Sequence, residues 1–252
     1  MKIKTNHMKK LFFLISILLC LSINGQQSFS LNINDQESFS KNRDRVWETV
    51  SNLPIDDSDW RYDDLRKNYL DNWQREIYRT IITYVGEITD YDTPSMYYLT
   101  IPEGDPSRIE LDASKFTQAD DQNHCVEHEL GHAAFMGYIN VPGWLIYLAN
   151  QTPKVPGFEN ALPYERIVRA LNVRRDIIDN YKLPLNAVIT DEQLQDYIKR
   201  KTGIMDFGLK WLVETTREDR LLPLLNFENG YLINEKAHPA PVTMTITKTI
   251  YW

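Results

Sequence analysis

Two histidines and a glutamate stand within five residues of one another, in the order His128-Glu129-Leu130-Gly131-His132. Side chains four residues apart on a helix lie one turn above each other, so His128 and His132 can bind one metal ion from the same side. Glu129 stands about 100° further round the helix axis, where its carboxylate flanks the ion and can accept a proton from bound water. The spacing therefore predicts two imidazole ligands for Zn²⁺ and a glutamate general base.

Apolar residues around these three side chains favour a buried helix, and few reasons other than a metal site exist to bury such groups together. Two alternatives stay open, namely a helix with two solvated histidines and a zinc site that is structural. The apolar neighbours are Val126, Leu130, Ala133 and Ala134.

A helix that carries this motif after an antiparallel strand pair resembles the zincin metallopeptidases. The resemblance rests on residues 96–170, and only the five-residue motif is specific. It implies an α+β, zincin-like fold, in which a small antiparallel or mixed sheet and the active-site helix precede a mostly helical C-terminal lobe. It also implies hydrolysis of peptide bonds by zinc-bound water. The metzincin branch is excluded, because Phe135 and Tyr138 stand where that branch has glycine and histidine.

A third protein ligand is needed, since a catalytic zinc ion has three of them and one open position. In gluzincin-like families a glutamate on a later helix supplies it. Glu165 lies in the first turn of a predicted helix, 33 residues after His132, and the stretch 163–170 resembles that ligand helix. Arg169 departs from the pattern, because an acid or a small residue often stands there. The alternative acids are Asp176, Asp179 and Glu159.

Two residues three and four positions before His128 are weaker candidates for metal binding. Cys125 shares the helix face of His128, but a single turn cannot easily direct the thiol and both imidazoles at one tetrahedral ion, so we expect a packed thiol. His124 is expected at the surface or behind a ligand. Catalysis also needs a hydrogen-bond donor for the oxyanion. The candidates for that donor are Tyr138, Tyr181, Tyr231 and His238.

Alternating apolar residues predict a strand pair before the motif. Residues 97–101 and 109–113 each alternate, and the turn-rich stretch 102–107 between them favours an antiparallel pair. Zincins commonly bind peptides against an edge strand, and the resemblance places that edge at Arg108–Ala113.

Helical periodicity predicts most of the remaining scaffold. Apolar residues every four positions from Leu65 to Val85 indicate one long helix, and the motif helix is expected to begin at an N-cap, Asp120 or Asp121, and to run to about Gly137. The polar stretch 26–42 is interpreted as a loose leader. The later elements are a short helix at 144–149, helices at 164–181 and after a Thr190–Gln193 capping box, a helix at 209–225 broken by Pro223, and a strand at 242–250.

Residues 1–25 are predicted to be a secretory signal peptide. Four lysines precede the apolar run Leu11–Leu21, which is too short to span a bilayer comfortably. Cleavage after Gly25 would give a secreted or periplasmic protein. Lipidation of Cys20 and an uncleaved membrane anchor are the alternatives.

The mature chain, 26–252, is predicted to be one zincin-like catalytic domain with two lobes that meet near 138–163. Loss of the four lysines takes the formal net charge from −7 to −11, so nucleic acid is not an expected partner. Cys125 would be the one remaining cysteine, which excludes an internal disulfide. We expect a secreted zinc metallopeptidase that acts on a peptide or protein, with no membrane span after processing. A non-catalytic zinc-binding protein and a zinc hydrolase of a non-peptide amide remain open.

Overall fold

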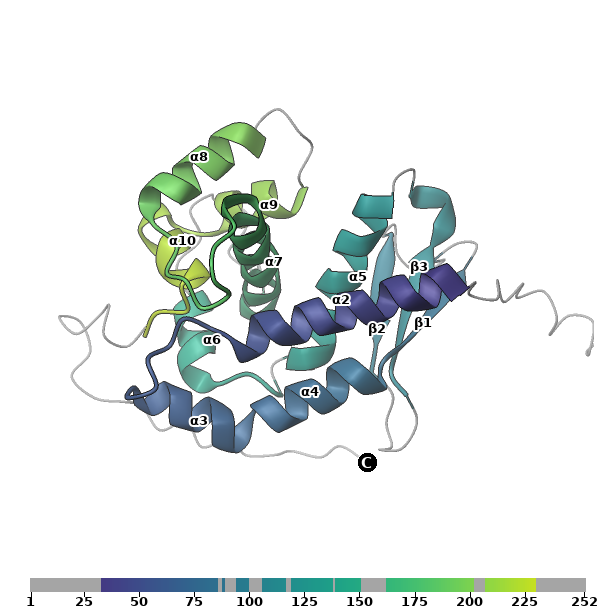
Figure 1. The fold of residues 1–252 in the computed structure, drawn as a ribbon, viewed down its shortest axis with the longest axis horizontal. Helices are drawn as coiled ribbons and strands as arrows, with labels where there is room; N and C mark the ends of the chain where they lie inside the picture. The colour runs from purple at the N-terminus through teal and green to yellow at the C-terminus, as the bar shows by residue number, and fades with distance from the viewer. Residues whose placement is uncertain are drawn as a thin grey trace, which may run out of the picture.

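The computed structural model describes residues 33–85, 88, 94–99, 106–116, 119–137, 139–150, 162–201 and 207–229. This part of the chain is mixed α and β, mostly helical, with one three-stranded sheet, as the predicted α+β class requires. In Figure 1 the sheet and helix α5 (Ala119–Phe135) lie on one side, and the later helices lie on the other. The predicted signal peptide and the predicted strand at 242–250 lie outside the described residues.

The sheet has the strand order β1-β3-β2 and mixes both strand directions. β3 (Arg108–Asp112) is parallel to β1 (Ile81–Val85) and antiparallel to β2 (Ser95–Tyr98), so the predicted antiparallel pair is confirmed. The expectation that Arg108–Ala113 forms a substrate-binding edge is wrong, because β3 is paired on both sides. β2 is the edge strand that packs against α5.

Helix α2 (Ile33–Ser51) overlaps the stretch 26–42, so the prediction of a loose leader is wrong from Ile33 onward. The helix has a buried face, but polar residues on that face hid its periodicity from hydropathy. Ser38 and Asn42 hydrogen-bond to Asn123 of α5, at 2.9 and 3.0 Å, and so replace apolar packing at this end. The buried side chains recur at helical spacing: Phe39, Asn42, Val46 and Val50.

The apolar stripe from Leu65 to Val85 does not form one helix. It is divided among α3 (Trp60–Asn68), α4 (Leu70–Arg79) and strand β1, with an interruption at Tyr69, whose φ of −128° is not helical. β1 consists only of β-branched and aromatic residues, which favour a strand. The predicted helix was therefore wrong beyond Arg79, because the four-residue spacing continued by coincidence into an extended segment.

Helix α5 carries the predicted metal-binding motif. It begins at Ala119, so Asp120 and Asp121 lie inside its first turn and neither is the predicted N-cap. The helix ends before two residues with left-handed backbone, Met136 with φ 45° and Gly137 with φ 64°.

Every described element after α5 is helical, as predicted for the C-terminal part. The short helix predicted at 144–149 is observed as α6 (Gly143–Ala149). The helix predicted at 164–181 is observed as α7 (Pro163–Tyr181), which begins at the proline. Thr190 and Gln193 form the predicted reciprocal capping box at the start of α8 (Asp191–Lys201), with hydrogen bonds of 3.0 and 3.3 Å.

The predicted break at Pro223 is wrong. The chain instead breaks between α9 (Phe207–Thr215) and α10 (Glu218–Leu225), and Pro223 lies inside α10. Proline removes one backbone hydrogen bond from the helix. Buried neighbours hold this short helix in place nevertheless, namely Leu221, Leu224 and Leu225.

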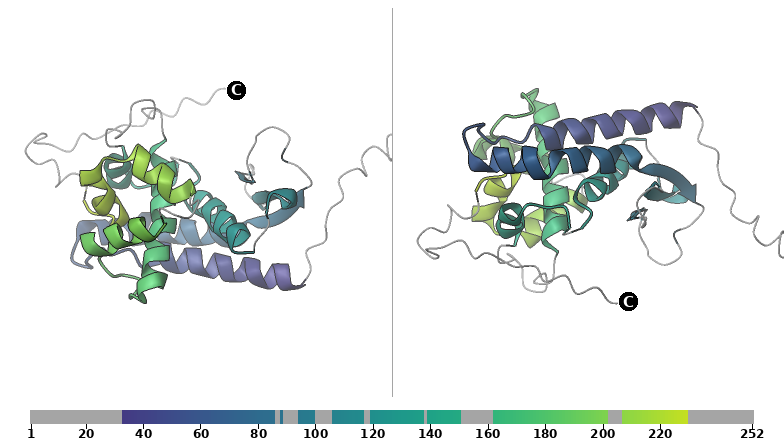
Figure 2. Two further views of the ribbon diagram at one scale, coloured as in Figure 1. Left: turned by 90° about the horizontal axis from the view of Figure 1, so that it is seen from above. Right: turned by 90° about the horizontal axis from the view of Figure 1, so that it is seen from below.

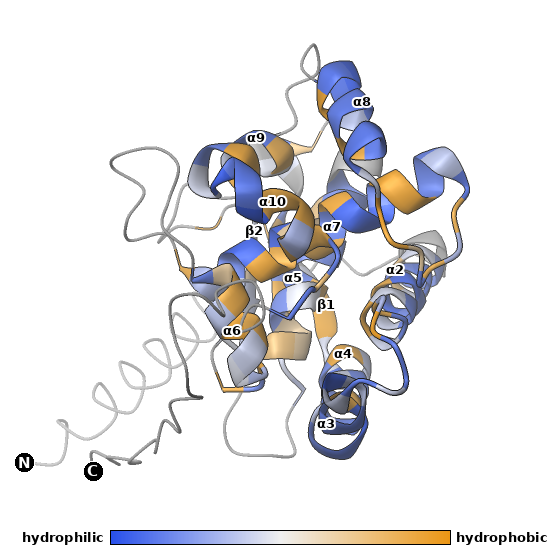
Figure 3. Cartoon of the chain, turned by 90° about the vertical axis from the view of Figure 1, so that its left-hand side faces the viewer, coloured by the Kyte–Doolittle hydropathy of each residue, from blue (hydrophilic) through white to orange (hydrophobic). Residues whose placement is uncertain are grey.

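Helix α5 is central to the packing of the molecule. It contacts α2, α4, α7 and β2, and Figure 2 shows α2 and α4 side by side. Buried apolar residues from both halves of the chain, Phe39 through Phe227, form one cluster. Figure 3 shows apolar stretches on α6, α7 and α10, three helices that pack on one another. Within the described ranges, no helix is long and apolar enough to cross a membrane.

Candidate metal centre

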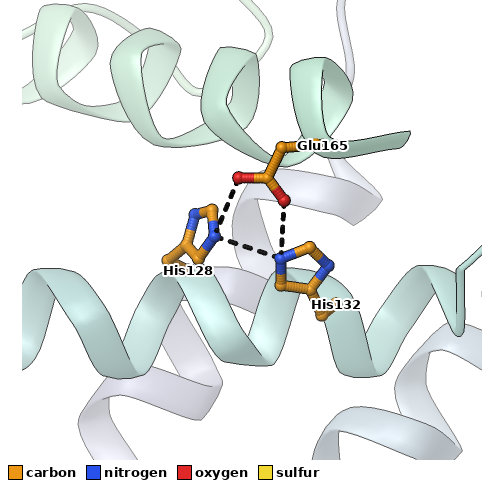
Figure 4. A group of neighbouring side chains, drawn as sticks. All are labelled: His128, His132 and Glu165. Carbon is orange, nitrogen blue, oxygen red and sulfur yellow. Dashed lines mark hydrogen bonds and ion pairs between the residues drawn. The ribbon is translucent and has the colours of Figure 1, made fainter. Parts of the chain in front are cut away.

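Two helices bring the three predicted zinc ligands together. His128 and His132 project from α5, and Glu165 reaches them from the first turn of α7 (Figure 4). The two imidazole Nε2 atoms are 3.1 Å apart, and the nearest Glu165 carboxylate oxygens lie 3.3 Å from His128 Nε2 and 3.0 Å from His132 Nε2. Among the described residues, this is the one group of potential ligands close enough to hold a metal ion.

The spacing of the three donor groups fits a tetrahedral metal ion. Ligand atoms that lie about 2.0–2.1 Å from such an ion stand about 3.3–3.4 Å from one another. The observed separations of 3.0, 3.1 and 3.3 Å are close to this value. Two imidazoles and one carboxylate also form a donor set that suits zinc and leaves one coordination position for water. The residues present therefore fit a zinc ion with one open coordination position.

The three groups change one another's affinity for protons. Burial opposes ionisation of Glu165, but hydrogen bonds from His128 and His132 outweigh it and hold the pKa of the carboxyl well below its usual range. Burial lowers the pKa of His128. Burial also acts against the charged form of His132, but there Glu165 outweighs it and raises the pKa. Near neutral pH the carboxylate is therefore ionised and His128 is neutral, which is the state in which both groups bind metal.

Glu129 lies beside the cluster without joining it. The residue is buried, with 6% of its surface exposed, and its Oε1 accepts a hydrogen bond of 2.7 Å from the Ser95 hydroxyl. Ser95 is the first residue of β2, so the edge strand fixes the orientation of the carboxylate. Sequence reasoning missed Ser95, because 34 residues separate it from Glu129 and no local pattern marks it.

Asn172 on α7 lies behind one of the imidazoles. Its amide Nδ2 is 3.4 Å from His128 Nδ1. A metal ion on His128 Nε2 would leave the proton on Nδ1, and the amide would have to turn over for its oxygen to accept that proton. Asn172 follows Glu165 by seven residues, two helical turns along the same face, and that spacing could have identified it.

The backbones of α5 and α7 come close together at Gly131, between the two histidines. A methyl group at this position would lie 2.8 Å from Val168 Cγ1, closer than side chains normally approach. A buried ion pair between Glu127 and Arg175 also joins the two helices. Burial raises the pKa of Glu127 in spite of the arginine beside it. These contacts set how far Glu165 stands from the histidines.

We expect Gly131→Ala to destabilise the protein by about 1–3 kcal/mol, although alanine is the better helix former. The added methyl group would meet Val168 and push the two helices apart. Val168→Ala removes the obstacle, so the double variant should lose less stability than the two single variants lose together. Urea unfolding of all four proteins measures this coupling. Strictly additive losses would show that the two positions do not meet.

The cluster opens into a pocket of about 490 Å³. Its walls come from β2 and the residues after it, from the end of α5 and from the start of α7. Tyr164 packs edge-on against His132, with ring centroids 5.6 Å apart. Apolar and aromatic side chains form much of the remaining lining, among them Met96, Tyr97, Leu99 and Met136.

The other candidate ligands that the structure describes are not placed to join the cluster. Asp176 accepts a hydrogen bond of 2.9 Å from the Tyr197 hydroxyl, and Asp179 forms an ion pair with Arg45. Glu159 lies outside the described residues. His124 and Cys125 are half-buried on α5, and neither belongs to the cluster.

Only one of the four oxyanion-donor candidates is described. Tyr181 ends α7, and its hydroxyl donates to Asp196 of α8, so this residue does not line the pocket. Tyr164 is a tyrosine that does pack against the cluster, and its position directly before Glu165 is a signal that the sequence contains. The other candidates, Tyr138, Tyr231 and His238, lie outside the described residues.

No protein-family model, curated protein or solved structure matches the chain. The geometry and chemistry of the site itself therefore carry the functional assignment.

Proposed function

We propose that the protein is a secreted zinc metallopeptidase of the zincin type, gluzincin-like in taking its third ligand from a later helix. The observation that carries the proposal is the meeting of His128, His132 and Glu165 in a pocket that Glu129 also lines. A small sheet beside the motif helix, followed by helices alone in the described part, supports a zincin-like domain. Residues 26–252 would form that single catalytic domain.

Each residue of the site has a role in this proposal. The three ligands would hold the zinc ion, which when bound lowers the pKa of water and polarises a carbonyl group. Glu129 is the general base, which accepts a proton from the attacking water and passes it to the leaving amine. Ser95 keeps the carboxylate of Glu129 in one orientation.

A peptide substrate would bind along β2. One side of this strand pairs with β3, and no described strand pairs with its other side. The side chains of Met96, Tyr97 and Leu99 line the pocket. An extended peptide that adds to such an edge gains backbone hydrogen bonds, and the pocket can then select among its side chains. β2 takes the role that the sequence led us to expect for Arg108–Ala113.

Zinc content and peptide cleavage, measured on one preparation, test the proposal. We expect one zinc ion per chain and cleavage of a denatured protein or a peptide library. A chelator should abolish cleavage, and added zinc should restore it. A protein that binds zinc but cleaves no peptide would instead be a non-catalytic zinc-binding protein or a hydrolase of a non-peptide amide.

Ser95→Ala is expected to lower kcat by about 10- to 100-fold, the range that follows from losing a hydrogen bond to a charged group. The carboxylate of Glu129 would keep its charge but lose the contact that orients it. Zinc content should not change, and Ser95→Thr should restore most of the rate because threonine keeps the hydroxyl. An unchanged kcat in Ser95→Ala would show that the contact does not position the base.

A further inference from the structure

Arg169 brings a positive charge into the pocket. It lies one helical turn after Glu165 on α7, and its Nε donates a hydrogen bond of 2.7 Å to Glu165 Oε1. Its guanidinium also lies over the ring of Trp211, 4.6 Å from the centroid. The side chain is 25% exposed and lines the same pocket as the metal cluster. Two contacts therefore hold a partly exposed guanidinium in a fixed plane beside the ligands.

Most of the hydrogen-bonding capacity of Arg169 remains available. A guanidinium has five N–H donors, and in the part of the chain that the structure describes its one hydrogen-bond acceptor is Glu165. The Nη1 and Nη2 groups can thus bind a further acceptor. Two parallel hydrogen bonds from such a fork match the two oxygens of a carboxylate.

The charges around the pocket favour the same kind of ligand. The described lining carries two carboxylates, Glu129 and Glu165, and one guanidinium, Arg169. A divalent ion would offset both carboxylates and leave the charge of the guanidinium in excess. Arg169 also repels a cation at the cluster, because like charges repel and its guanidinium contacts the ligand Glu165. An anionic group on the substrate would offset that repulsion.

We propose that Arg169 binds a carboxylate of the substrate, so that the pocket selects peptides that present one near the scissile bond. The inference rests on the proposed zinc peptidase function and names its substrate class. The carboxylate comes either from a free C-terminus or from an aspartate or glutamate side chain. Both sources present the same two oxygens to the fork.

A second role for Arg169 makes a different prediction. If the arginine only positions Glu165, its removal changes the affinity for zinc and lowers the affinity for every peptide by the same factor. If it binds a substrate carboxylate, its removal abolishes the difference between acidic peptides and their neutral counterparts. The ratio of two affinities within one variant therefore separates the roles, whatever happens to the metal.

The experiment measures peptide binding by calorimetry on zinc-loaded Glu129→Gln protein. The probes are pairs of hexapeptides that end in a carboxylate or a carboxamide, and pairs with Asp or Asn at each internal position in turn. We expect at least one acidic peptide to bind about 10- to 100-fold more tightly than its neutral partner, the range for hydrogen bonds to a charged group. The pair that shows the difference identifies the source of the carboxylate.

Three arginine variants in the same background complete the test. Arg169→Gln should remove the preference, and Arg169→Lys should keep part of it, because lysine retains the charge but not the fork. Arg200→Gln is the matched control, since Arg200 also pairs with an acid four residues earlier and stacks on a tyrosine, but lies outside the pocket. It should keep the full preference. The proposal would be overturned if the acidic and neutral peptides of every pair bound equally well, or if the preference for the acidic peptide survived Arg169→Gln. Because the experiment measures binding, it tests the role of Arg169 even if the protein cleaves no peptide.

Discussion

Replacing Glu129 with glutamine is expected to lower kcat by about 10²- to 10⁴-fold while the protein keeps its zinc. Glutamine has nearly the same shape and can still accept the hydrogen bond from Ser95 through its amide oxygen, but it cannot take up a proton. The loss corresponds to about 3–5 kcal/mol of activation free energy. Peptide cleavage and zinc content are to be measured on the same preparation.

His128→Ala is the comparison for this variant, because it changes the neighbouring residue on the same helix and removes a ligand. It should lose zinc and activity together. Glu129→Gln protein that cleaves peptides as fast as the wild type would rule out Glu129 as the general base. Loss of zinc from Glu129→Gln would show that the carboxylate helps to hold the metal.

Replacing Glu165 with alanine is expected to weaken zinc binding by more than about 100-fold, beyond the loss that follows from removing an outer partner of a ligand. The substitution removes a negative charge and the carboxylate that lies 3.0–3.3 Å from both imidazole Nε2 atoms. Competition with a chromogenic zinc chelator measures the affinity. Circular dichroism before zinc is added establishes that the variant is folded.

Cys125→Ser is the control for the ligand assignment. Cys125 lies on the helix that carries both histidines, three residues before His128, but outside the cluster. Its serine variant should bind zinc with the affinity of the wild type. A Cys125→Ser protein that loses zinc, beside a Glu165→Ala protein that retains it, would replace the carboxylate by the thiol as the third ligand.

The helix that carries Glu165 was predictable from the sequence because its signals are local. Proline at the first helical position sets the backbone for the first turn, and Glu165 lies two residues later. The spacing of His128 and His132 is likewise a property of one helix. Patterns of this kind need no knowledge of what packs against them.

The features that the sequence did not reveal depend on contacts between distant segments. β1 continues the apolar spacing of α4, and only its pairing with β3 decides that it is extended. Asn42 on α2 looks like a surface residue until Asn123 of α5 is found beside it. Ser95 reaches Glu129 only because β2 takes the edge of the sheet next to α5. Such roles follow from tertiary structure and leave no local periodicity.

The ligands of the candidate centre come from two helices, and Glu165 on the second lies 33 residues after His132 on the first. An ion bound by both helices would close that loop as a reversible cross-link. The unfolded chain cannot bring the three donors together, so binding would favour the folded state, by about 2.7 kcal/mol when free zinc exceeds the dissociation constant 100-fold. The surfaces joined in this way already touch at Gly131 and Val168, so little rearrangement is needed. The supply of free zinc would then govern how long the folded protein survives, as well as how fast it works.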